Sequence, residues 1–163
     1  MSLDTRALFL PIILGAVSLG FAGSGLAATE ASHDHGEAQH ELQLNAGQKW
    51  ATDAPLRKAM GELSETLRQS LPAIHKNTFA DAGYSKLSEQ VNASVAYMVE
   101  NCALPPEADA QLHVIIASML AGAESMAGNT PAESRRAGAV KLIGALDNYG
   151  AYFADPGFKP INH

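Results

Sequence analysis

The sequence predicts an all-α protein, an antiparallel up-down-up-down four-helix bundle. Apolar residues recur at steps of three and four in four stretches of about 17 to 24 residues, which is the period of one helix face. No stretch alternates apolar and polar residues with a period of two. Short links containing proline or glycine separate the stretches, and short links favour neighbouring helices that run in alternate directions.

The first helix is predicted to begin just after Thr52 or Asp53, either of which can cap it, with Pro55 in the first turn. Its apolar residues fall at steps of four, three and four: Leu56, Met60, Leu63 and Leu67. Pro72 is expected to interrupt the helix, because proline lacks the amide that an interior helical position uses. We therefore interpret the residues from Pro72 to Tyr84 as a connection.

The second helix is predicted from about Ser85 to Cys102, with the cysteine at its very end. Its apolar face is formed by Leu87, Val91, Val95, Met98 and Cys102. The third helix is expected to open at Pro106 and run to about Met126, where Gly128 closes it. Its inward residues are Leu112, Ile115, Ile116, Met119, Leu120 and Ala123.

The fourth helix is predicted to start at Thr130, with Pro131 in its first turn and Glu133 as the acid of a capping box. Its apolar residues are Val140, Ile143, Leu146, Tyr149 and Phe153. The sequence ADPGFKP ends it.

Residues 1–27 have the pattern of a secretory signal peptide: Arg6 precedes an apolar run, 7–22, and small residues follow. Cleavage after Ala27 would deliver the protein to the periplasm. The alternative is a retained membrane anchor, but the apolar run of about 16 residues is short for a membrane span and contains Pro11.

Residues 28–47 form a polar segment that we interpret as a flexible arm in front of the bundle domain, 48–163. The arm contains His33, His35 and His40, and short histidine tracts of this kind can collect divalent transition metals. The alternative is a soluble tether, since the spacing matches no closed zinc site.

The formal net charge of −6 argues against nucleic acid as a partner, and against an anionic membrane surface once the signal peptide is removed. The chain has one cysteine, so an internal disulfide is impossible. In an exported protein, a single thiol indicates a buried inert residue, an intermolecular bond or a metal ligand. A metal ion, a protein partner or a second copy of the chain are the partners that these observations leave.

Four side chains are predicted to share one end of the bundle: Met60, Met98, Cys102 and His113. With a rise of about 1.5 Å per residue, all four lie within about 10 Å of that end. A thiol, an imidazole and thioethers form a soft ligand set that suits copper, above all Cu(I). Each residue also has a purely structural interpretation: the methionines as core filler, Cys102 as a small buried side chain, His113 at the edge of the core.

In architecture the chain resembles the exported four-helix bundles of the cytochrome b562 and cytochrome c′ type. Met60 occupies a position comparable to the early methionine that ligates haem in the b-type members. The predicted fourth helix has no histidine, and Cys102 is followed by ALPP rather than completing the CxxCH of the c′ type. The resemblance implies haem as an alternative cofactor. A non-covalent haem held between Met60 and His113 would depart from the ligand arrangement of that family. The chain is also similar in character to small periplasmic proteins of Gram-negative bacteria, a likeness that implies no activity.

No enzyme is expected. Cys102 and His113 have the residue types of a nucleophile and base, but their estimated axial separation of about 10 Å does not favour contact. GxSxG, HExxH and glycine-rich phosphate motifs are absent from the sequence. We therefore predict a periplasmic copper-binding protein for storage, delivery or resistance. The alternatives are a structural or interaction bundle without metal, and a haem-binding bundle.

Overall fold

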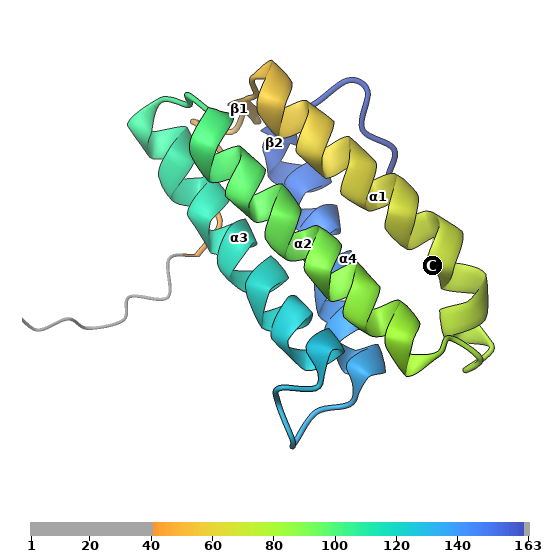
Figure 1. Ribbon diagram of the computed structural model, residues 1–163. Helices are drawn as coiled ribbons and strands as arrows, with labels where there is room; N and C mark the ends of the chain where they lie inside the picture. The colour runs from red at the N-terminus through yellow and green to blue at the C-terminus, as the bar shows by residue number, and fades with distance from the viewer. Residues whose placement is uncertain (1–40, 162–163) are drawn as a thin grey trace, which may run out of the picture. The chain divides into compact units, whose positions relative to one another are not determined.

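The computed structural model describes residues 41–161, and within them the chain forms four helices (Figure 1). The helices are α1 (Ala54–His75), α2 (Asp81–Asn101), α3 (Pro106–Ala127) and α4 (Arg135–Tyr152). Two short strands, β1 (Trp50–Ala51) and β2 (Phe153–Ala154), pair in parallel just before α1 and just after α4. The predicted all-α four-helix bundle is confirmed.

Contacts between helix termini define two ends of the bundle. At one end, which we call the cysteine end, Asp53 before α1 accepts a hydrogen bond from the amide of Ala103 after α2, at 2.7 Å. The β1–β2 pair brings the end of α4 to the same place. At the opposite end, which we call the arginine end, Arg135 at the start of α4 reaches Asp81 at the start of α2. Consecutive helices therefore run in alternate directions (Figure 1).

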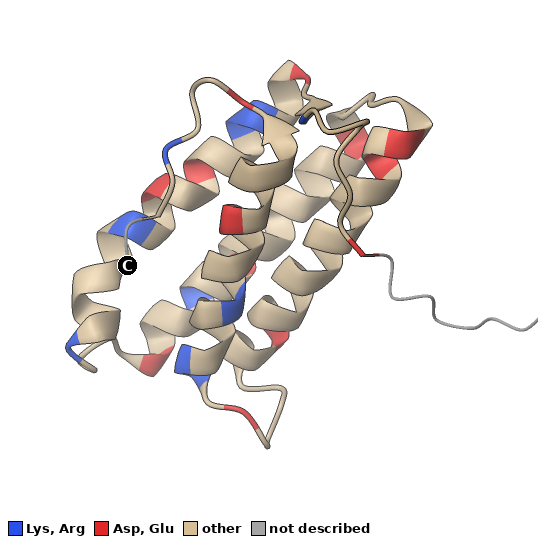
Figure 2. Ribbon diagram, turned by 180° about the vertical axis from the view of Figure 1, so that it is seen from behind, with Lys and Arg blue, Asp and Glu red and all other residues tan. Residues whose placement is uncertain are grey.

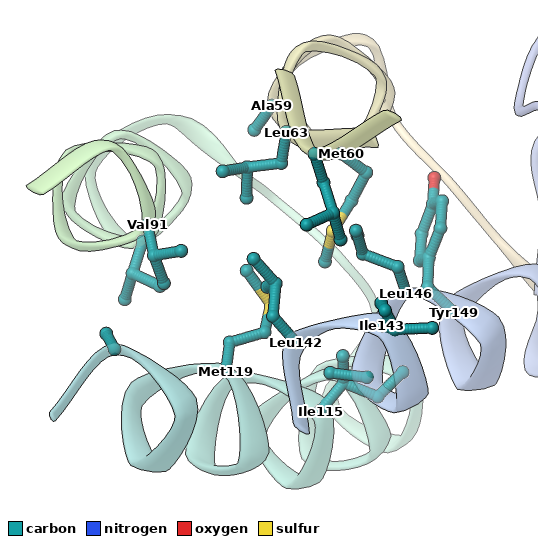
Figure 3. Packing of buried hydrophobic residues seen from close by; sticks show 14 of the residues in the cluster. Ala59, Met60, Leu63, Val91, Ile115, Met119, Leu142, Ile143, Leu146 and Tyr149 are labelled. Carbon is teal, nitrogen blue, oxygen red and sulfur yellow. The ribbon is translucent and has the colours of Figure 1, made fainter. Parts of the chain in front are cut away.

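The hydrophobic core lies between the four helices. The face predicted for α1 is confirmed, since Leu56, Met60, Leu63 and Leu67 are each buried. Figure 3 shows side chains from α1, α2, α3 and α4 meeting in this core. Of the apolar residues predicted to face inward, Leu120 and Val140 are instead exposed on α3 and α4.

The helices α3 and α4 approach closely where two glycines face each other. A methyl group on Gly138 would lie 2.5 Å from the carbonyl oxygen of Gly122 and 2.7 Å from the amide nitrogen of Met126. Both neighbours are backbone atoms, which cannot move aside as a flexible side chain can. The absence of a side chain at Gly138 therefore sets the distance between these two helices.

The expected end of the first helix at Pro72 is wrong, because α1 continues through Pro72 to His75. Proline costs a helix one hydrogen bond, but it can be accommodated when packing holds the turn around it. Leu71 and Ile74 are both buried and fix this last turn to the core, while Pro72 itself is exposed to solvent.

The predicted start of the fourth helix at Thr130 is also wrong. The N-cap is Ser134, whose side chain accepts a hydrogen bond from the Ala137 amide at 3.1 Å. Glu133 does not close a capping box: its carboxylate contacts Lys141 and the hydroxyl of Ser125 instead. Because the Glu133 carboxylate is already paired with Lys141 and Ser125, the local capping sequence at Thr130 does not start α4.

The segment after β2 packs along α1 instead of leaving the bundle (Figure 2). The hydroxyl of Ser64 donates to the carbonyl oxygen of Lys159 at 3.1 Å, and Ile161 is buried. Phe158 contacts Tyr149 edge to face, with ring centroids 4.9 Å apart. This segment therefore covers part of the core on the side of α1 and α4.

The predicted signal peptide, 1–27, and most of the predicted arm lie outside the described residues. The part of the arm from Glu41 to Gly47 is described and contacts the bundle: the Gln43 amide donates to the Gln111 side chain, and the Trp50 indole donates to the Gln43 carbonyl. Among residues 41–161, none of the helices combines the length and hydropathy that crossing a bilayer requires.

Candidate functional site

Cys102 caps the C-terminus of α2 at the cysteine end. Its amide donates to the Met98 carbonyl at 2.9 Å, and its side chain is half-buried against the core. Burial raises the pKa of the thiol to about 11, and the charge of Asp53, a hydrogen bond to Asp53 and the charge of Asp109 act in the same direction. Cys102 is therefore a protonated thiol at neutral pH.

Asp53 is the residue that fixes the surroundings of this thiol. As N-cap of α1 it accepts from the Leu56 amide through Oδ1 at 2.9 Å, and its Oδ2 accepts from the Ala103 amide at 2.7 Å. One carboxylate thereby ties the start of α1 to the residue that follows Cys102. From the sequence, Asp53 is identified only as a helix cap, because nothing in a single sequence links it to a residue 50 positions later.

His113 lies on the outer side of α3, with its side chain 64% exposed. Its Nδ1 is 2.9 Å from the Asp109 carbonyl oxygen and 3.3 Å from Asp109 Oδ2. Asp109 is also close enough to Cys102 for its charge to raise the pKa of the thiol. The structure thus brings Cys102 and His113 to one end of the bundle with Asp109 between them.

Met98 and Met60 are both buried in the core, at 1% and 0% exposure. Met98 precedes Cys102 by one helical turn, so it lies on the same face of α2. Met60 points from α1 into the apolar interior among aliphatic side chains (Figure 3). Neither thioether is open to solvent.

These residues do not form a ready metal site of the usual kind. Within residues 41–161, there is no group of three or more histidine, cysteine, aspartate or glutamate side chains that could hold a metal ion. His33, His35 and His40 of the arm lie outside the described residues. The haem alternative would need His113 to turn inward, because it faces solvent while Met60 faces the core.

The environment of Cys102 is the reverse of the one that activates a nucleophile. Catalytic thiols lie beside positive groups that lower their pKa. Here burial and carboxylates raise it.

The other side of the cysteine end is closed by Tyr149, which is fully buried. Its hydroxyl donates to Asp155 Oδ2 at 2.9 Å, and burial with this hydrogen bond raises the pKa of Tyr149 above its ordinary value. Asp155 also accepts from the Gly157 amide at 2.9 Å. The cysteine end therefore contains several carboxylates that serve as hydrogen-bond acceptors.

Comparison with known proteins yields no relative from which a role could be transferred: no family model, no curated protein and no solved structure matches this chain.

Proposed function

We propose that the protein is exported to the periplasm and binds a soft metal ion, Cu(I) above all, at the cysteine end of the bundle. The observation that carries the proposal is the position of the chain's one thiol. Cys102 is half-buried, one turn from a buried thioether, and under the influence of two carboxylates. Storage, delivery and resistance are the roles that such binding could serve.

The carboxylates favour a cation for the same reason that they disfavour a thiolate. The negative charge of Asp53 and Asp109 opposes loss of the thiol proton when nothing replaces it. A metal cation that displaces the proton restores the balance of charge, so metal binding releases a proton and strengthens as pH rises. Cys102 supplies the anionic ligand in this scheme.

Met98 and His113 are the partners for Cys102 in the proposed site. Soft sulfur ligands select Cu(I), and the thioether of Met98 belongs to the same face of α2 as the thiol. His113 joins by leaving Asp109 and turning toward the thiol, a movement that its 64% exposure leaves room for. Met60 is buried in the core and is the fourth ligand only if the core rearranges. The arm histidines His33, His35 and His40 collect metal for the site.

The test is anaerobic titration of the full chain with Cu(I) in competition with a coloured chelator. Cys102→Ala should abolish tight binding and the ultraviolet thiolate-to-copper absorption, and His113→Gln should weaken binding. Met119→Leu, which changes a buried methionine of the same core, is the matched control and should bind as the unaltered protein does. Equal binding by the unaltered protein and Cys102→Ala would refute the proposal. A Soret band in protein isolated from its natural host would favour haem instead.

A second candidate function, an interaction bundle that pairs with a copy of itself, is favoured by a feature of α4. Val140 is 57% exposed beside a hollow of about 260 Å³ between α1 and α4. Gly144, one turn away, has open space where a side chain would be. Two α4 helices crossing here would seat Val140 of one chain against Gly144 of the other. Sedimentation at rising concentration tests this, and Val140→Glu should abolish any self-association that is seen.

A further inference from the structure

A polar hollow at the arginine end lies far along the bundle from Cys102. It has a volume of about 600 Å³ and lies where α2 and α4 begin. The side chains that matter for its chemistry are Tyr84 from α2, Ser134 and Thr130 from the link before α4, and Arg136 from the first turn of α4. Figure 2 shows basic residues in this first turn of α4.

Arg135 and Arg136 are neighbours in sequence with different surroundings. Arg135 is engaged within the protein: its guanidinium donates to the Met126 carbonyl and to the Ser85 hydroxyl and pairs with Asp81 at 3.6 Å. Arg136 is exposed and borders the hollow. The positive charge that the hollow offers to a solute is therefore that of Arg136.

Two acidic side chains around the hollow, Asp81 and Glu133, each have a positively charged partner. Asp81 is paired with Arg135, and Glu133 is held by Lys141 at 2.6 and 2.8 Å. The first turn of α4 contains no acidic residue. Ser134 takes the Ala137 amide, and Ser134, Arg135 and Arg136 at the start of the helix line the hollow. The first amides of a helix have no partner within the helix. Such amides and the helix dipole favour a negative charge.

Tyr84 supplies the independent observation that points to a ligand. Tyr84 is buried, with a relative exposure of 5%. Its ring packs edge to face on Phe79, with ring centroids 4.8 Å apart. Its hydroxyl has no hydrogen-bond partner among residues 41–161. In that part of the chain every fully buried side-chain oxygen or nitrogen has a partner, so the Tyr84 hydroxyl itself is not fully buried. The hydroxyl therefore opens to the hollow that its residue lines.

The electrostatics of Tyr84 agree with this placement. Burial raises the pKa of its hydroxyl above the ordinary value, the charge of Arg136 acts to lower it, and the charge of Asp81 acts to raise it. Tyr84 is thus a neutral donor at physiological pH, with the Arg136 guanidinium near it.

We propose that this hollow is a binding site for a phosphate-type oxyanion, held by the Arg136 guanidinium, the Tyr84 hydroxyl and the first amides of α4. Guanidinium groups, hydroxyl groups and the amides at a helix start are donors that bind phosphate groups in proteins. The anion is either free phosphate or the phosphate group of a small solute. This proposal is independent of metal binding at the cysteine end.

The test is calorimetric titration of the full chain with inorganic phosphate in chloride buffer at constant ionic strength. Loss of the charged fork in Arg136→Gln should weaken binding by about tenfold or more, and Tyr84→Phe, which keeps the ring packing, by about three- to tenfold. Lys58→Gln removes an exposed positive charge near the start of α1 and is the matched control, for which no change is expected. Parallel titrations with glycerol phosphate and with acetate distinguish a phosphate group on a larger solute from free phosphate and from a carboxylate.

Two results would overturn the proposal. One is the absence of phosphate binding by the unaltered chain. The other is binding that Arg136→Gln and Lys58→Gln weaken equally and that Tyr84→Phe leaves unchanged, which would indicate general attraction of anions to positive charge. Circular dichroism of each variant confirms that it is folded, and Arg136→Lys provides a second measurement: it keeps the charge, loses the fork and should bind with intermediate strength.

Discussion

Each end of the bundle is tied together by a charged side chain, Asp53 at the cysteine end and Arg135 at the arginine end. At the cysteine end, carboxylates accept hydrogen bonds from backbone amides and hydroxyls, as Asp53 does from Leu56 and Ala103. At the arginine end, guanidinium groups donate to backbone carbonyls, as Arg135 does to Met126. Helix starts leave amides without partners and helix ends leave carbonyls without partners, and both kinds occur at each end of the bundle. Asp53 serves amides at the start of α1 and after the end of α2, whereas Arg135 serves a carbonyl in the last turn of α3.

The two ends also differ in the sign of the charge that each one favours in a ligand. In the two proposals, the carboxylates around Cys102 favour a cation, whereas Arg136 and the start of α4 favour an anion. A chain with a formal net charge of −6 can thus have a local site for either sign. The following predictions test the comparison, beginning with the largest expected change in stability.

The largest effect is expected at the helix contact next to the arginine end. Gly138→Ala places a methyl group 2.5 Å from the Gly122 carbonyl oxygen, and the backbone on both sides must move. We expect a loss of about 3 kcal/mol in the free energy of unfolding. Gly144→Ala, on the same helix but with open space around it, should instead stabilise by about 0.5 to 1 kcal/mol. Urea unfolding measures both, and equal responses would contradict this account of the α3–α4 contact.

A smaller but still large effect is expected for the carboxylate that organises the cysteine end. Asp53→Ala removes a helix cap, the bond to the Ala103 amide and the bond to the Cys102 thiol, and should cost about 2 to 3 kcal/mol. Ser134→Ala, which removes only a cap at the arginine end, should cost about 1 kcal/mol. If thermal unfolding shows the two variants equally destabilised, Asp53 acts as a cap alone.

Those parts of the fold that depend on spacing within one helix are predictable from the sequence. Leu56, Met60, Leu63 and Leu67 stand at helical steps, and all are buried. The start of α3 at Pro106 and its close at Gly128, with a positive φ of 87°, also follow from local backbone chemistry. Such features can be predicted because neighbours in sequence determine them.

Features decided by tertiary contacts were not predictable in this way. Thr130 and Pro131 form a good local start for a helix, but Glu133 has its partners in Lys141 and Ser125, and the helix begins later. The link between Asp53 and Cys102 joins two helices and leaves no pattern in either one. For the candidate metal site, residue spacing predicted that the ligands share one end of the bundle. The exposure of His113 depends on how α3 is rotated, which a weak apolar stripe does not fix.

A pH-dependent prediction concerns Glu133 at the arginine end. Hydrogen bonds from Lys141 and from Ser125 hold the pKa of this carboxyl below its ordinary value. Its contribution to stability is therefore present above the unfolded value of about 4.3 and is lost as pH falls through the lower folded value. Glu133→Gln should be less stable than the unaltered protein near pH 6, and this gap should narrow on acidification. Glu107→Gln, at an exposed position, is the control. Unfolding curves at several pH values measure the difference in stability between Glu133→Gln and the unaltered protein. A difference that stays constant with pH would refute the role of Glu133.

The smallest effect on stability, and the finest test of the cysteine end, is expected from Asp109→Asn. Because the charge of Asp109 contributes to raising the pKa of Cys102, its removal should lower that pKa and increase the fraction of thiolate. Asp109 is half-exposed and solvent screens it, so the rate of alkylation by iodoacetamide at pH 8 should rise only about two- to threefold. Glu107→Gln, in the same first turn of α3, removes an equal charge from a residue that is not among the causes of the Cys102 shift, and should leave the rate unchanged. Equal alkylation rates in the unaltered protein and both variants would mean that the charge of Asp109 does not act on the Cys102 thiol. That result would refute the electrostatic link that Asp109 makes between Cys102 and His113.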